Sequence, residues 1–189
     1  MTRRQFAESS RSHRSGPFAD LRFGVSDLAH RPGVMRSVEK AVVVPGLGAG
    51  GVGLAEPESI ELDLRLEGVG KGIVVEGFLR GQWVAECSRC LEPVTGPFVV
   101  EVHELFEEQP VESETYLLEG EEIDIEPMVR DAVLLELPTA PLCTDDCLGL
   151  CPVCGADRNT QACQCIQPTS DDRWAALRAL SFDETSEHR

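Results

Sequence analysis

The sequence predicts an α+β fold: an antiparallel β meander or partly open barrel with one packed helix and a C-terminal cysteine-rich ribbon. Apolar and polar residues alternate without a break from residue 60 to residue 67, which indicates a half-buried strand. Further short apolar segments follow at close spacing, separated by turn residues, as in an antiparallel meander. An amphipathic helical pattern begins at residue 127, and three pairs of cysteines follow it.

Seven segments have the composition and length of strands. The clearest one places Ile60, Leu62 and Leu64 on one face and Glu61 and Asp63 on the other. The chain is expected to turn after residue 67 and to run back along this strand. The predicted strands cover residues 38–44, 60–67, 73–79, 83–87, 98–106, 116–118 and 123–125.

Two glycine patterns need separate interpretation. Residues 46 to 51 match the GxGxxG dinucleotide fingerprint letter by letter. That fingerprint works only where its glycines open a helix whose amides hold a pyrophosphate, and here Pro57 and a strand follow within a few residues. We therefore expect a hairpin loop rather than a nucleotide site. Gly77 and Gly81 lie inside strand segments and are expected to mark β-bulges.

Four parts can be distinguished along the chain. Residues 1–35 form a basic, partly disordered arm, in which Ser26 begins a short helix or turn. Residues 36–138 form the β-rich body with its helix, residues 139–168 a cysteine-rich zinc segment, and residues 169–189 a short docking helix and tail. The body helix is expected over 127–137, because Pro127 suits a first helical turn and Pro138 ends the helix.

Both predicted helices have an apolar face. The first face should lie on the sheet, and it comprises Met128, Val129, Ala132, Val133 and Leu135. The second should dock the C-terminal segment, and it comprises Trp174, Leu177 and Leu180.

Charge is distributed unevenly. The 189 residues carry 17 Lys and Arg against 33 Asp and Glu, a formal net charge of -16. The first 40 residues contain 8 basic and 4 acidic residues, so the rest of the chain contains 9 basic and 29 acidic residues, a net charge of -20. Such a body repels nucleic acid and attracts basic proteins or cations. An alternative is that the acidic surface serves only solubility.

No segment provides the ~20 apolar residues of a membrane span, so we expect no membrane association. The residues after Arg3 and Arg4 are too polar for an export signal. A cytoplasmic location is therefore expected, where thiols stay reduced and cysteines serve metals more often than disulfides.

The densest acidic segment lies between residues 101 and 126, with eleven Asp and Glu and no Lys or Arg. One interpretation is the solvated face of a strand joined to an acidic loop. The other is a docking surface for a basic partner.

The eight cysteines occur in four closely spaced pairs, and two of these flank short turns of the kind that bind zinc. Cys151-Pro152-Val153-Cys154-Gly155 has the form of a zinc knuckle, in which glycine supplies a positive backbone angle. The favoured grouping joins the first pair to the second and the third to the fourth, because ligands from one compact loop close at lower entropy cost. The pairs are Cys87 and Cys90, Cys143 and Cys147, Cys151 and Cys154, and Cys163 and Cys165.

The other grouping joins the second pair to the third and the first to the fourth. In either grouping all ligands are thiolates, so two structural zinc ions are expected, the second closing a small zinc ribbon. Three alternatives compete: a redox pair at Cys87 and Cys90, an iron–sulfur cluster, and a cysteine nucleophile. The last has little support, because only His103 among the histidines lies in a predicted structured element.

Taken together, these motifs resemble the YceD family of large ribosomal RNA subunit accumulation proteins, from residue 31 to the last predicted helix. The similarity is carried by the segments Cys87-Ser88-Arg89-Cys90-Leu91-Glu92-Pro93-Val94, Glu104-Leu105-Phe106, Ile123-Asp124-Ile125, Leu135-Glu136-Leu137-Pro138, Pro141-Leu142-Cys143 and Cys147-Leu148-Gly149-Leu150-Cys151-Pro152-Val153-Cys154-Gly155. One departure is Asp157, where relatives tend to carry asparagine. We interpret it as a change on the loop surface, with a weaker local turn as the alternative.

The resemblance implies a non-enzymatic role in the synthesis, processing or stability of large-subunit ribosomal RNA, acting in ribosome assembly. Two partners are compatible with the charge distribution. A basic large-subunit ribosomal protein could bind the acidic segment, or ribosomal RNA precursors could bind basic residues near the N-terminus. An alternative class is a metal- or thiol-dependent enzyme of RNA maturation. The candidate RNA-binding residues are Arg3, Arg4, Arg11, Arg14, Arg22, Arg31 and Arg36.

Overall fold

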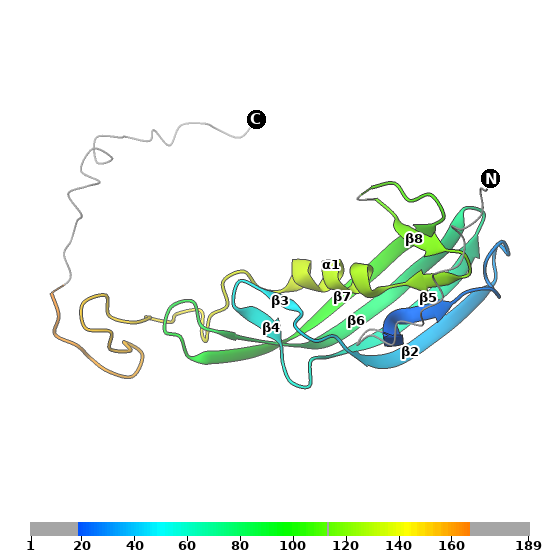
Figure 1. Ribbon diagram of the computed structural model, residues 1–189. Helices are drawn as coiled ribbons and strands as arrows, with labels where there is room; N and C mark the ends of the chain where they lie inside the picture. The colour runs from blue at the N-terminus through cyan, green and yellow to red at the C-terminus, as the bar shows by residue number, and fades with distance from the viewer. Residues whose placement is uncertain (1–18, 113, 167–189) are drawn as a thin grey trace, which may run out of the picture.

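In residues 19–112 and 114–166, which the computed structural model describes, the chain forms a curled nine-stranded sheet with one α-helix on it (Figure 1). The predicted disordered segment up to residue 17 and the predicted last helix lie outside the described residues. So do four of the candidate RNA-binding residues, Arg3, Arg4, Arg11 and Arg14.

Three long strands form the centre of the sheet. β5 and β7 pair with opposite edges of β6, and both pairings are antiparallel. The remaining strands extend this centre on both sides in the order β1-β9-β8-β7-β6-β4-β3, with β2 on the outer edge of β5. The elements are η1 (Ala19–Leu21), β1 (Arg22–Gly24), β2 (Met35–Val43), β3 (Gly48–Ala49), β4 (Val52–Leu54), β5 (Ser59–Val69), β6 (Gly72–Glu86), β7 (Pro93–Glu107), β8 (Tyr116–Glu119), β9 (Glu122–Asp124) and α1 (Glu126–Glu136).

Alternating side chains of the central strands build the core. The even-numbered residues of β5 from Ile60 to Leu66 are buried, whereas Glu61, Asp63 and Arg65 are exposed, as the sequence pattern predicts. Strands β6 and β7 run without interruption for 15 residues each. The two predicted segments 73–79 and 83–87 are therefore parts of one strand.

Two cationic side chains of β2 help to close the curl of the sheet. Arg36 donates to the carbonyl oxygen of Gly24 at 2.8 Å and pairs with Asp27 at 3.0 Å. Lys40 pairs with the carboxylate of Asp20 at 2.6 Å. Because Gly24 ends β1, these contacts connect the outer strand β2 to the segment that carries β1. The curled sheet is a half-barrel, which agrees with the predicted partly open barrel, but the expected antiparallel order is broken where β8 pairs with β7 in parallel.

Helix α1 packs on the face of the sheet that carries the buried side chains of the central strands. In Figure 1 it lies along β7. Met128, Val129 and Val133 are buried in the core that includes Phe106 of β7. The prediction that Leu135 belongs to this face is wrong, because its side chain is 88% exposed. At 100° per residue, Leu135 lies within about 20° of the buried Met128, so its exposure follows from its position in the last turn of the helix and not from its angle around the axis.

The predicted bulges at Gly77 and Gly81 are also wrong. The pairing of β6 with β5 and with β7 continues through both glycines without an extra residue. Close packing explains these glycines instead: a Cβ on Gly77 would lie 2.1 Å from the carbonyl oxygen of Asp63, and one on Gly81 would lie 2.6 Å from the ring of Phe98. The hairpin expected at residues 46–51 is confirmed with a shorter loop: Gly48 and Ala49 form β3, which pairs with β4 across Gly50 and Gly51.

The cysteine-rich segment after α1 consists mainly of turns. Between residues 139 and 166 the structure contains one isolated β-bridge, Leu150 with Asp157. It therefore does not confirm a zinc ribbon. The segment from Ser26 to His30 forms turns, in agreement with the expected turn at Ser26. No helix of the described residues is long and apolar enough to cross a membrane.

Candidate metal centres and acidic end

The turn between β6 and β7 meets the segment that follows α1. Its six residues, 87–92, connect the last pair of the hairpin, Glu86 with Pro93. The amide of Ser88 donates to the carbonyl oxygen of Pro141 at 2.8 Å, which connects the turn to the chain beyond the helix. This contact brings Cys143 and Cys147 to Cys87 and Cys90.

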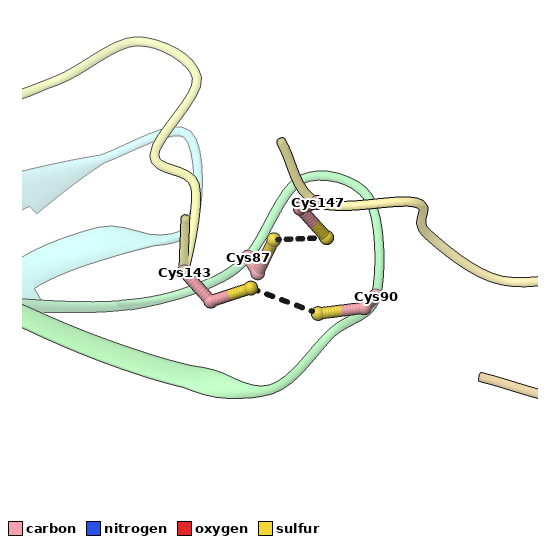
Figure 2. Close-up of side chains that lie close together, drawn as sticks. All are labelled: Cys87, Cys90, Cys143 and Cys147. Atoms are coloured by element: carbon pink, nitrogen blue, oxygen red, sulfur yellow. Dashed lines mark hydrogen bonds between the residues drawn. The ribbon is translucent and has the colours of Figure 1, made fainter. Parts of the chain in front are cut away.

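These four cysteines form the first cysteine site (Figure 2). The Sγ atoms of Cys87 and Cys147 are 3.8 Å apart, and those of Cys90 and Cys143 are 3.5 Å apart. A tetrahedral ion with metal–sulfur bonds near 2.3 Å would place neighbouring sulfurs about 3.8 Å apart. The four thiols therefore fit a zinc ion, which would hold the β6–β7 turn and the chain after α1 together.

The other four cysteines form the second cysteine site, which comprises Cys151, Cys154, Cys163 and Cys165. In each site the four sulfur atoms lie within 4.8 Å of one another, and all eight cysteines are free thiols. The structure thus shows the favoured of the two groupings that the spacing allows.

Both sites are built on the same knuckle turn. In the first, the amide of Leu91 donates to the carbonyl oxygen of Cys87 at 3.0 Å, and the amide of Cys87 donates to that of Glu92 at 2.8 Å. In the second, Gly155 and Cys151 make the corresponding bonds, both at 2.8 Å. The fifth residue of each turn has a positive φ, 66° at Leu91 and 73° at Gly155. From the sequence, only the second knuckle could be predicted, because Gly155 is typical of a positive φ. Leucine rarely adopts this conformation, so Leu91 gave no such indication.

Backbone amides directed at sulfur favour ionised cysteine in both knuckles. Burial raises the pKa of the Cys87 thiol, but the backbone amides of Arg89, Cys90 and Cys143 together lower it by more, so that the pKa is about 6. The Arg89 amide nitrogen lies 3.5 Å from the Cys87 sulfur. In the second site, the backbone amides of Cys154 and Val153 lower the pKa of Cys151 to about 6.

Other thiols in the same sites keep their protons. The Glu92 amide lowers the pKa of Cys90, yet burial and the neighbouring thiols raise it to about 12. The thiol of Cys154 is the main cause that raises the pKa of Cys165 to about 12. Without a cation, each cluster therefore holds thiolates and thiols together at neutral pH, and full ionisation needs a positive ion at the centre.

Polar groups around the first site include residues that sequence reasoning missed. The guanidinium of Arg89 donates to the carbonyl oxygen of Cys147 at 2.9 Å. The side-chain amide of Asn159 donates to the Cys147 sulfur at 3.4 Å. Asp157 stabilises its turn, because its carboxylate accepts bonds from Asn159 and Thr160. The Asn159 amide is the main cause that holds the pKa of Asp157 below its usual value.

The predicted acidic segment lies at the other end of β7. Fourteen residue steps of about 3.3 Å separate the two ends of this strand, so Glu107 lies about 46 Å along the strand from the cysteine turn, and Glu101, eight steps from Pro93, about 26 Å. Of the eleven acidic residues, Asp124 pairs with Arg22 and Glu126 with Arg130. The other nine have no basic partner among the described residues, and we call them the acidic end: Glu101, Glu104, Glu107, Glu108, Glu112, Glu114, Glu119, Glu121 and Glu122.

Three of the candidate RNA-binding arginines lie in the described part of the chain. Arg22 pairs with Asp124 at 3.1 Å, and Arg36 pairs with Asp27. The guanidinium of Arg31 lies 3.5 Å from the carbonyl oxygen of Asp27. Two of the three are thus neutralised by carboxylates of the same chain.

A small β-sheet protein with two four-cysteine sites is the class that this fold and these clusters define. Residues 75–181 match the model of the family described as large ribosomal RNA subunit accumulation protein YceD. The chain belongs to the YceD family, and the resemblance seen in its motifs is confirmed.

Similar proteins occur in bacteria and plants. An uncharacterized protein of Mycobacterium tuberculosis is 35% identical over 182 residues, covering 92% of this chain and 86% of its own. A maize protein named large ribosomal RNA subunit accumulation protein YCED homolog 1, chloroplastic, is 25% identical and is matched over 76% of this chain and 60% of its own. A shorter match of 62 residues, 37% identical, covers 33% of this chain and 19% of the Arabidopsis thaliana protein of that name. No solved structure matches this chain.

Proposed function

We propose that this chain is a non-enzymatic factor for the synthesis, processing or stability of large-subunit ribosomal RNA, which acts in ribosome assembly in the cytoplasm. The family description and the name of the maize relative support a role in large-subunit RNA. The partner it binds is a basic ribosomal protein of the large subunit, which it holds before delivery to the assembling particle.

The observation that carries this choice of partner is the acidic end. Nine carboxylates without a basic partner among the described residues gather on the end of β7, the following loop and the β8–β9 hairpin. A field of this sign repels the phosphates of RNA and attracts lysine- and arginine-rich protein segments. A basic partner would supply the positive charges that pair with these carboxylates.

Two structural zinc ions complete the proposal, one held by Cys87, Cys90, Cys143 and Cys147 and the other by Cys151, Cys154, Cys163 and Cys165. Their role is to fold the cysteine segment, because four thiolates leave no open position for water at the metal. Cys87 and Cys90, the pair considered for redox chemistry, are also buried, whereas Cys143 and Cys154 are exposed. These features favour a structural role over thiol or metal catalysis.

We also propose that the chain has the four parts predicted from its sequence. These are an arm (1–35), a body (36–138), a cysteine segment (139–168) and a docking helix with a tail (169–189). The last part of the arm is packed on the sheet, since Leu21, Val25 and Leu28 are buried in the core. Direct RNA binding by the arm is the competing mechanism. It would use Arg31 and the four arginines before it that lie outside the described residues.

Neutralising the acidic end tests the proposal. The variant changes five exposed residues to glutamine: Glu108, Glu112, Glu114, Glu119 and Glu121. A matched control makes the same change at five exposed glutamates elsewhere: Glu39, Glu56, Glu61, Glu86 and Glu92. Tagged proteins are purified at low salt with and without ribonuclease treatment, and captured ribosomal proteins are quantified.

A basic large-subunit protein should be captured by the wild type and the control, and at least tenfold less by the acidic-end variant. Capture at the wild-type level by the acidic-end variant would overturn the proposed docking surface. Capture that ribonuclease abolishes in all three proteins would favour RNA binding instead.

A further inference from the structure

The two cysteine sites are adjacent in the chain and in space. Only residues 148–150 separate Cys147 of the first site from Cys151 of the second. The loop between Cys154 and Cys163 folds back over this connection: Asp157 forms a β-bridge with Leu150, and the amide of Arg158 donates to the carbonyl oxygen of Gly149 at 3.0 Å. A loop of the second site therefore covers the exit of the chain from the first.

Asn159 of this loop contacts the first site directly. Its Nδ2 atom lies 3.4 Å from the Cys147 sulfur, and its Oδ1 atom accepts a bond from the Leu148 amide at 2.8 Å. The second bond fixes the orientation of the side chain, because only an oxygen can accept from that amide. The nitrogen must then face the sulfur.

Asp157 holds Asn159 in this position. One carboxylate oxygen accepts from the backbone amide of Asn159 at 3.0 Å and from its side-chain nitrogen at 2.8 Å. The other accepts from the Thr160 hydroxyl at 3.0 Å. The loop thus has its own internal bonds, but both of its ends are fixed by cysteines of the second site.

We propose that Asn159 is a positioning residue through which the second cysteine site stabilises metal in the first. A filled second site fixes Cys154 and Cys163 and so holds the loop against Cys147, where the N–H···S bond stabilises the thiolate ligand. Loss of metal from the second site frees the loop, and the first site then releases its metal faster. This inference rests on the proposed metal binding of both sites.

The coupling works in both directions, because linkage between two binding equilibria is reciprocal. Groups that hydrogen-bond to metal ligands typically contribute 10- to 100-fold to metal affinity. Removing the Asn159 side-chain amide should therefore increase metal release from the first site by about tenfold. Its replacement by aspartate should have a larger effect, because a carboxylate would oppose the thiolate of Cys147.

The test uses the full chain loaded with zinc. Each protein is exposed to a chelator, unprotected thiols are labelled in timed pulses with N-ethylmaleimide, and labelled peptides are counted by mass spectrometry. The peptide containing Cys87 and Cys90 reports on the first site, and the one containing Cys151 and Cys154 reports on the second. The variants are Asn159→Ala, Asn159→Asp and Cys163→Ser, with Gln161→Ala as an exposed control in the same loop.

The inference predicts faster labelling of Cys87 and Cys90 in Asn159→Ala, in Asn159→Asp and in Cys163→Ser, and wild-type labelling in Gln161→Ala. Combining Asn159→Ala with Cys163→Ser should add little to either change, since both act through one loop. Wild-type labelling of Cys87 and Cys90 in Asn159→Ala and Cys163→Ser, with two zinc ions bound to the wild-type chain, would overturn the coupling alone. A wild-type chain that binds no zinc would overturn the metal sites and the coupling together.

Discussion

Chelation of the metal is expected to unfold the cysteine segments and to leave the β-sheet folded. The reason is that the structure has two separate cores. The large one contains the buried residues of the strands and α1 and includes no cysteine. The small one consists of Cys87, Cys90 and Cys147, with only Val94, Leu142 and Leu150 packed against it.

The magnitudes decide the outcome for the small core. Its three partly buried apolar side chains contribute roughly 4 kcal/mol. Fixing the backbone of the 28 residues from 139 to 166 costs about 1 kcal/mol or more each, so roughly 28 kcal/mol must be offset. Two four-thiolate zinc sites contribute on the order of 10 kcal/mol or more each, which closes this difference. Without metal, the segment lacks most of its stabilisation.

Hydrogen exchange measured by mass spectrometry checks this expectation. After chelation, the amides of Leu91, Leu150 and Gly155 should exchange at the rate of an unfolded chain, because their bonds lie within the knuckles and the loops around them. The amides of β5 and β6 should keep their protection. A chelator already saturated with zinc serves as the control. Persistent protection of residues 139–166, or loss of protection in β5 and β6, would refute the division into two cores.

Three further predictions concern the strand centre, the knuckles and the single tyrosine. Gly77→Ala should lower the free energy of unfolding by about 3 kcal/mol in urea titrations, because its Cβ would clash with β5, whereas Gly70→Ala, with open space around it, should change it by less than about 1 kcal/mol. Leu91→Gly should slow metal release from the first site, since it removes about 1 kcal/mol of strain at a positive φ, and Gly155→Leu should speed release from the second; equal rates in both variants and the wild type would contradict this. Burial and nearby carboxylates raise the pKa of Tyr116 to about 12; its absorbance at 295 nm should therefore titrate near that value. Stability should fall as pH rises from about 10 to 12, where only the unfolded tyrosine ionises, and a midpoint near 10 in the folded protein would contradict this packing.

Much of the sheet could be predicted because its strands carry a period-two pattern. Residues 60–67 are buried and exposed in the expected alternation. The pattern is less informative about glycine, which suits both a bulge and a close approach of neighbouring strands. Gly77 and Gly81 both allow a close approach of neighbouring strands. This is visible only in the structure, where the carbonyl oxygen of Asp63 lies against Gly77 and the ring of Phe98 against Gly81. The exposure of Leu135 likewise depends on where the helix lies on the sheet.

The grouping of the eight cysteines into two sites could be predicted in part from the sequence. Chain entropy favours closing Cys151, Cys154, Cys163 and Cys165 within one compact loop, and the structure has this grouping. The first site instead joins cysteines that are 53 and 60 residues apart in the sequence. The contact of Asn159 with Cys147 could not be predicted, since it requires the second loop to fold back over the first site. Pairing of Arg22 with Asp124 and of Arg36 with Asp27 also depends on the curl of the sheet. A basic N-terminal segment in the sequence is therefore partly neutralised in the fold.

Sedimentation of the tagged protein from gently lysed cells at low salt, with and without ribonuclease, tests the proposed function most directly. Gradient fractions are probed for the protein, for ribosomal RNA precursors and for ribosomal proteins. We expect a light complex with a basic large-subunit protein that survives ribonuclease, together with a fraction on immature large subunits. A protein that sediments only as a free chain under both conditions would contradict it.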